Sequence, residues 1–157
     1  MKRILAASIA AMLLAVANVG AQEGSKQQTV APPAANEPYE PGLGEIMALQ
    51  QMRHMKLWFA GHAGNWSLAD YEIGELKEGF DEVSNRLGGD IVANAVGARI
   101  SELERAISAE DGAAFVGAFD KLTVGCNSCH RTLDRGFIVI RRPTLRPYGN
   151  QSFTTQK

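Results

Sequence analysis

Two cysteines and a histidine are the residues of this chain with the clearest chemical potential. They stand together as Cys126-Asn127-Ser128-Cys129-His130, and the chain of 157 residues has no third cysteine. A Cys-x-x-Cys-His run is the attachment sequence of c-type haem. Residues three apart lie on one side of a helix, so both thiols can reach the two vinyl groups of one porphyrin. The adjoining His130 can then bring a ring nitrogen beneath the iron as its proximal ligand.

Three other kinds of site compete for the cysteine pair. A structural disulfide between Cys126 and Cys129 is conceivable in an oxidising compartment, but it would close a very small ring. A thioredoxin-like redox pair normally opens a helix next to a strand, and no strand pattern precedes this motif. A zinc site needs four suitably spaced ligands, and the remaining His54 and His62 do not stand at finger-type spacing. The motif therefore favours one covalent haem c, with its iron, over all three.

Four segments with helical periodicity must position this motif. In each, apolar positions recur at spacings of four and three, which places them on one face of a helix. The four stripes are Leu43, Met47, Gln50, His54, Leu57 and Gly61; Ala69, Ile73, Leu76, Phe80, Val83 and Leu87; Val92, Val96, Ile100, Leu103 and Ile107; and Phe115, Phe119, Leu122, Cys126, Cys129 and Leu133. Short loops between them predict an all-α fold, an antiparallel four-helix bundle over residues 41–135 with an extended C-terminal tail.

Capping signals predict where these helices begin. Ser67, with an acid three residues on, resembles a capping box and predicts the start of the second helix. Gly88, Gly89 and Asp90 predict a turn and then a cap for the third helix, and the pair at 64–65 separates the first helix from the second. Glu110 and Asp111 place negative charge at the positive end of the fourth helix dipole.

Two segments precede the predicted bundle. Residues 1–21 combine Lys2 and Arg3, an apolar run of about 14 residues and a small-residue cleavage site near Ala21, which is typical of a signal peptide. The run is shorter than the roughly 20 residues that span a bilayer, so we expect cleavage rather than an uncleaved anchor, and no membrane span in the mature chain. Residues 22–40 are rich in Gln, Ala and Pro and predict a flexible leader. The mature protein is then expected in the periplasm of a bacterium.

Residues 136–157 are predicted to form an extended basic tail. Residues 136–140 are rich in β-branched side chains, and Pro143 and Pro147 prevent a continuing helix. Without the signal peptide the net charge is −3, from 14 basic and 17 acidic residues, yet residues 131–157 hold six basic groups and one acid. We expect the tail to dock on the acidic bundle rather than to steer an anionic partner. Nothing in this distribution predicts a nucleic-acid partner.

The sixth coordination position of the iron has several candidates. In an up-down-up-down bundle the end of the last helix lies beside the start of the first, which carries Met47, Met52, His54 and Met55. We predict His54 as the distal ligand, because an imidazole on an otherwise apolar stripe needs a partner for its nitrogens. The alternatives are a Met ligand, an open site, and a core His54 that is hydrogen-bonded to a backbone carbonyl or a haem propionate.

The motif and the helices together resemble one family. A four-helix pattern with Cys126-x-x-Cys129-His130 near the end of its last helix is similar to the class II c-type cytochromes, the cytochrome c′ and cytochrome c556 group. Class I cytochromes place the motif near the N-terminus instead. The resemblance covers about residues 41–135, and the haem motif is its specific part. It implies a four-helix haem protein and is compatible with a homodimer.

The resemblance also implies where a sixth ligand would stand. In the family this position lies about three turns into the first helix, where a Met gives a low-spin electron carrier and an apolar residue leaves an iron that binds small gases. Here the position falls close to His54, which suggests a bis-His haem. The chain departs from the family further in its longer tail after Arg135 and in Asp134, which stands where a basic residue is typical.

The sequence thus predicts a periplasmic mono-haem c-type cytochrome that carries single electrons between redox partner proteins. No substrate-processing group is visible beside the motif, so we do not expect an enzyme. One alternative is a protein of the same family that binds NO or CO. The other is a haem-free helical module in which Cys126 and Cys129 form a structural pair.

Overall fold

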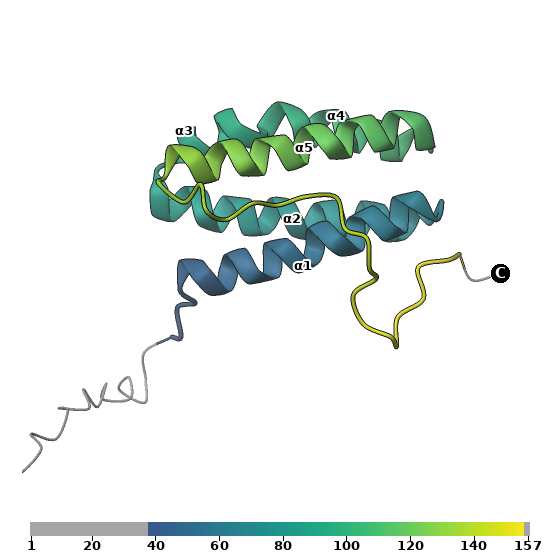
Figure 1. Ribbon diagram of the computed structural model, residues 1–157, viewed down its shortest axis with the longest axis horizontal. Helices are drawn as coiled ribbons and strands as arrows, with labels where there is room; N and C mark the ends of the chain where they lie inside the picture. The colour runs from purple at the N-terminus through teal and green to yellow at the C-terminus, as the bar shows by residue number, and fades with distance from the viewer. Residues whose placement is uncertain (1–37, 156–157) are drawn as a thin grey trace, which may run out of the picture. The chain divides into compact units, whose positions relative to one another are not determined.

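The computed structural model describes residues 38–155 of the chain. The predicted signal peptide, 1–21, and most of the predicted leader, 22–40, lie outside the described residues. Within them the fold is all-helical and contains no strand (Figure 1). The elements are α1 (Leu43–His62), α2 (Trp66–Leu87), α3 (Gly89–Val92), the π-helical segment η1 (Ala93–Gly97), α4 (Ala98–Ser108) and α5 (Gly112–Thr132). The predicted all-α class is therefore confirmed for this part of the chain.

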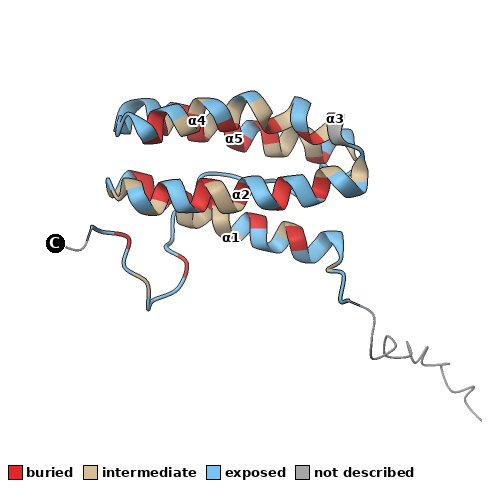
Figure 2. Cartoon of the chain, turned by 180° about the vertical axis from the view of Figure 1, so that it is seen from behind, coloured by how far each residue is buried: buried red, intermediate tan, exposed pale blue. Residues whose placement is uncertain are grey.

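The two long segments at the ends of the fold match their predicted stripes. In α1, His54 and Leu57 are buried, and in α5 Phe115, Phe119 and Leu122 are fully buried. The aromatic residues pack against one another, with 5.0 Å between the ring centroids of Trp58 and Phe119. Figure 2 shows that buried residues recur along α1, α2, α4 and α5. Burial of these apolar faces is the main term that stabilises the helices.

The third predicted helix is not a single α-helix. It consists of α3, η1 and α4 in direct succession, and because α3 begins at Gly89 the predicted cap at Asp90 is wrong. A π-helical turn holds an extra residue, which disturbs the regular pairing of backbone carbonyls with amides. Arg99 compensates, because its Nη1 donates a hydrogen bond of 2.6 Å to the carbonyl oxygen of Ala95. The apolar period alone did not predict this interruption.

The helix caps partly follow the predictions. Asp111, predicted to place negative charge at the start of the last helix, caps α5, since its carboxylate accepts hydrogen bonds from the amides of Ala113 and Ala114 at 3.0 Å. The predicted cap of α2 is wrong: the N-cap is Asn65, whose side chain accepts from the amide of the residue three positions on at 3.2 Å. Ser67 lies inside the first turn. The chain turns at Gly64, with a φ of 69°, and this turn brings Asn65 to the cap position.

Each long helix contacts two others. α1 packs along α2 and α4 packs along α5, while α1 also contacts α5 and α2 also contacts α4. Arg53 and Lys56 of α1 pair with Glu75 and Glu72 of α2, respectively. No helix in the described part of the chain has the length and apolar character needed to cross a membrane.

The tail after α5 returns along the helices without forming a helix or strand up to residue 155 (Figure 1). Arg142 pairs with Asp120 of α5, and its guanidinium lies 4.6 Å from the ring centroid of Trp58. Further on, Phe153 is fully buried and contacts Phe59, with 5.7 Å between ring centroids. The tail therefore docks on the helices of its own chain, as the charge distribution predicted.

Candidate functional site

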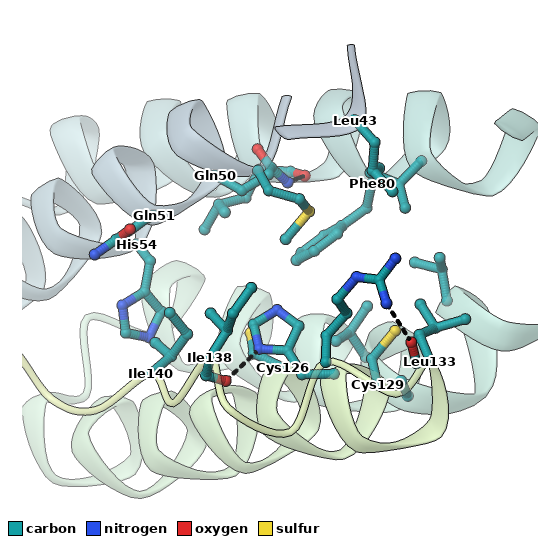
Figure 3. A pocket seen from close by; sticks show the side chains of 18 of the residues that line it. Leu43, Gln50, Gln51, His54, Phe80, Cys126, Cys129, Leu133, Ile138 and Ile140 are labelled. Atoms are coloured by element: carbon teal, nitrogen blue, oxygen red, sulfur yellow. Dashed lines mark hydrogen bonds between the residues drawn. The ribbon is translucent and has the colours of Figure 1, made fainter. Parts of the chain in front are cut away.

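An apolar cavity of about 470 Å³ lies among α1, α2, η1, α5 and the start of the tail (Figure 3). Its size falls within the range of roughly 300–1,000 Å³ that is common for ligand and cofactor pockets. The lining includes Met47, Gln50 and His54 of α1, Leu76 and Phe80 of α2, Val96 of η1, and Cys126, Cys129 and His130 of α5. The three motif residues thus line the same cavity as His54, the predicted distal residue, although His54 is far from the motif in the sequence.

The two cysteines stand in the last turns of α5, and both line the cavity. Neither forms a disulfide in the described chain. Burial raises the pKa of the Cys126 thiol to about 12, and burial also raises the pKa of Cys129. The C-terminal end of a helix disfavours a thiolate further. This pair therefore lacks the low pKa of a thiol that exchanges disulfides, whereas two neutral thiols on one wall of an apolar cavity fit covalent attachment of a porphyrin.

His130 is held in the form that a metal ligand requires. Its Nδ1 lies 2.9 Å from the carbonyl oxygen of Ile138. A carbonyl oxygen can only accept a hydrogen bond, so Nδ1 is the donor, and a neutral imidazole with its proton on Nδ1 has its free lone pair on Nε2. Histidines that bind metals commonly donate their other ring N–H in this way. The contact appears in Figure 3 as the dashed line that ends at Ile138.

His54 is buried and already has a hydrogen-bond partner. Its Nε2 lies 2.9 Å from the hydroxyl oxygen of Thr123, and this hydroxyl donates to the carbonyl oxygen of Phe119 at 3.0 Å. The hydroxyl proton is therefore used, so Nε2 must be the donor to Thr123. Burial lowers the pKa of His54 to about 4, which keeps the ring neutral at pH 7. Only Nδ1 retains a free lone pair, so ligation through Nε2 would require this hydrogen bond to break.

The other predicted distal candidates separate into two groups. Met47 lines the cavity, whereas Met52 and Met55, both among the described residues, do not. The sulfur of Met52 instead accepts a hydrogen bond of 2.8 Å from the hydroxyl of Tyr148. Of the four candidates, the cavity therefore brings together Met47 and His54.

A polar network fixes α1 against α2 beside the cavity. Gln50 is buried, and its Nε2 donates to the carbonyl oxygen of Leu76 at 2.7 Å. Arg53 donates to Gln50 Oε1 at 3.0 Å and to Glu75 at 2.8 Å. Gly79 leaves room for this amide, because a Cβ there would lie 2.4 Å from Gln50 Oε1. Arg53 therefore serves the contact between helices rather than the cavity.

Sequence reasoning missed two residues of this site. Arg135 is, within the described chain, the one charged side chain other than histidine that lines the cavity, and it suits the carboxylates of a porphyrin. Asn127 stands inside the motif and is hydrogen-bonded to Ile140 of the tail. The nearness of Arg135 to the motif was a usable signal. No signal identified the partner of Asn127, because the path of an irregular tail leaves no periodicity.

Comparisons with known proteins add no relative to this picture. No protein-family model matches the chain, and no curated protein and no solved structure matches it. Within residues 38–155, no three His, Cys, Asp or Glu side chains are grouped so that they could hold a metal ion by themselves. The features of the chain that indicate a function are therefore the motif, the cavity and the hydrogen bonds around them.

Proposed function

We propose that this chain is a periplasmic mono-haem c-type cytochrome of the class II kind, which carries single electrons between redox partner proteins. One observation supports it above all: Cys126, Cys129 and His130 line a single apolar cavity of cofactor size. The hydrogen bond from Nδ1 of His130 to Ile138 adds to this, since it leaves Nε2 available as a ligand. We also infer an antiparallel four-helix bundle, because each long helix contacts two others in a closed order.

Different residues around the cavity would bind different parts of a haem. Cys126 and Cys129 would each add a thiol across one vinyl group, so that sulfur and proton both end on the porphyrin side chain. His130 would offer Nε2 to the iron, and Arg135 would pair with a propionate. When bound, the haem supplies a one-electron Fe(III)/Fe(II) couple. The apolar walls exclude water and lower the local dielectric, and this burial helps to set the reduction potential.

Helix geometry points to Met47 as the sixth ligand. His54 is hydrogen-bonded to Thr123, which precedes His130 by seven residues along α5. α1 and α5 run in opposite directions in Figure 1, so seven residues back along α1 lead from His54 to Met47, at the level of His130. Seven residues correspond to about 10 Å along either helix, at about 1.5 Å per residue, so both steps cover the same distance. We therefore rank Met47 above His54, whose Nδ1 makes it the second candidate.

The sixth ligand can be tested by two matched variants, Met47→Ala and His54→Ala. If Met47 binds the iron, Met47→Ala converts a low-spin absorption spectrum into a high-spin one, whereas His54→Ala leaves it low-spin. The opposite result assigns the ligand to His54. Neither variant removes the cysteines or His130, so both should still carry covalent haem.

Binding of a small gas such as NO or CO is the second candidate function. The hydrogen bond between His54 and Thr123 favours it, because it withholds the Nε2 of the predicted distal ligand. An open sixth position would appear as a high-spin wild-type spectrum. Uptake of CO by the reduced wild-type protein without displacement of an endogenous ligand would then replace the electron-carrier proposal.

The primary experiment is a mass measurement together with spectra of the oxidised and reduced protein after expression with a cytochrome maturation system. We expect the mass of the polypeptide plus one haem, and a spectrum that changes reversibly with one electron. A Cys126→Ala, Cys129→Ala double variant is the control and should lose the covalent haem. A colourless wild-type protein with the mass of its amino acids alone would refute the proposal and favour the haem-free module.

A further inference from the structure

Asn127 joins the haem motif to the tail through both ends of its side-chain amide. Its Nδ2 donates to the carbonyl oxygen of Ile140 at 2.7 Å, and its Oδ1 accepts from the amide nitrogen of Ile140 at 2.7 Å. The side chain thus pairs with the backbone of a single residue, as a neighbouring strand would. We name this pair of hydrogen bonds the Asn127 clamp.

The clamp lies two residues beyond the carbonyl that His130 uses. The Ile138 oxygen accepts from Nδ1 of His130 at 2.9 Å. On its other side, the amide of Ile138 donates to the carbonyl oxygen of Arg135 at 2.8 Å. The acceptor of the His130 proton is therefore held between a turn that begins at Arg135 and the clamp at Ile140. Ile138, Ile140 and Cys126 all line the cavity (Figure 3).

Backbone hydrogen bonds alone would not hold this stretch of tail. Phe137 and Val139, on either side of Ile138, are exposed at 79% and 70% and contribute little burial. Loops with little buried surface open readily. The Asn127 clamp adds two hydrogen bonds of 2.7 Å to this weakly buried stretch, which gives it an influence on the position of the Ile138 carbonyl.

We propose that Asn127 is a positioning residue for His130: through the Asn127 clamp it fixes the Ile138 carbonyl, which in turn fixes the ring orientation and the Nδ1 proton of His130. This inference rests on the proposed function, since it concerns the imidazole as an iron ligand. An outer partner that accepts the Nδ1 proton makes Nε2 a stronger donor to a metal. Stronger donation favours the oxidised iron, so the clamp lowers the reduction potential.

The test compares Asn127→Ala with Ser128→Ala. Both replace a variable position of the same motif, and the Ser128 side chain forms no hydrogen bond with any described residue. We expect Asn127→Ala to raise the reduction potential by about 59 mV. This shift corresponds to a tenfold change in the equilibrium constant for one-electron reduction. Hydrogen exchange of the amides at 138–140 should become faster in Asn127→Ala. Ser128→Ala should change neither quantity.

A second variant removes the same contact from the tail side. Ile140→Pro deletes the amide that donates to Asn127 and leaves the sequence of α5 unchanged. We expect a smaller rise in reduction potential in the same direction. This variant keeps the test decisive if Asn127→Ala impairs folding or haem attachment.

Failure of the proposed function can be distinguished from failure of the positioning role of Asn127. If wild-type protein carries no haem, the proposed function fails, and faster exchange at 138–140 in Asn127→Ala would show only that the clamp holds the tail. If both variants carry haem and exchange faster at 138–140 but keep the wild-type reduction potential, the proposed function stands and the positioning role of Asn127 is overturned.

Discussion

At the scale of single residues, the chemistry of this chain depends on motif side chains and also on backbone atoms, which the residue type does not identify. The sequence predicted Cys126, Cys129 and His130 as a unit, and the structure places all three at one cavity. The backbone carbonyl of Ile138, which accepts the hydrogen bond from His130, could not be predicted, because every residue has the same backbone atom. Side chains that carry a motif can thus be found from sequence, whereas their supporting backbone atoms require the path of the chain.

His54 gives a prediction for the pH dependence of stability. Burial lowers its pKa from 6.5 to about 4 in the folded chain, while the unfolded chain keeps the ordinary value. The unfolded state therefore binds more protons between these values, and stability falls as the pH decreases from about 6.5 to about 4. The contribution is at most about 3 kcal/mol. Urea unfolding of His54→Leu at several pH values should show a smaller loss of stability across this range.

Thr123→Val is the control for this measurement. It removes the partner of the His54 Nε2–H but keeps the titrating ring. We expect it to lower stability by about 1–3 kcal/mol near pH 7, because a buried donor is left unpaired, and to retain the pH dependence. An equal pH dependence in wild type and His54→Leu would show that other groups cause the acid sensitivity.

At the scale of elements, apolar periodicity predicted the helices but not their irregularities. The stripe on the second helix is buried from Ala69 to Val83, as expected. The π-helical segment η1 was not predicted, although the third stripe is the one with two successive spacings of four, from Val92 to Val96 to Ile100, and η1 lies within them. The segment lies against α5, where Gly125, the residue before Cys126, packs against the backbone carbonyl of Ala95. The irregular turn and the glycine together bring η1 close to the cavity.

The close approach of α5 to η1 predicts the effect of Gly125→Ala. An added Cβ would lie 2.5 Å from the carbonyl oxygen of Ala95 and 2.7 Å from the Arg99 side chain. The carbonyl belongs to the backbone, so it cannot turn away as a side chain would. We expect a loss of about 1–3 kcal/mol in the free energy of unfolding, although alanine is the better helix former.

Gly117→Ala in the same helix is the matched control. Apart from the neighbouring backbone of α5 itself, no described atom lies within 4 Å of an added Cβ there, so helix propensity should raise stability by up to about 1 kcal/mol. Thermal unfolding of the two variants therefore moves in opposite directions from the wild type. If Gly125→Ala also raises stability, α5 and η1 do not approach each other closely enough for an added Cβ to clash.

At the scale of the whole molecule, the tail is part of the fold rather than an appendage. Its basic residues were expected to dock on the acidic helices, and Arg142 does so at Asp120. That ion pair is exposed, so it contributes at most about 1 kcal/mol. The apolar contact of the fully buried Phe153 with Phe59 is a stronger attachment, and no periodicity of the sequence predicted it. The tail is thus fixed at its far end by burial and near the motif by hydrogen bonds to Asn127 and His130.

Phe153→Ala tests whether the far attachment matters to the site. Loss of a fully buried aromatic ring should cost about 3 kcal/mol or less, because a tail can detach without unfolding the helices. Leu145→Ala, at a residue that is 81% exposed in the same tail, should change stability by less than about 0.5 kcal/mol. Amide exchange then locates the effect. Faster exchange around residue 153 with unchanged protection at 138–140 would show that the clamp at Asn127 holds the tail near His130 independently. Loss of protection at both places would mean that the tail releases as one unit and that burial of Phe153 supports the acceptor of the His130 proton.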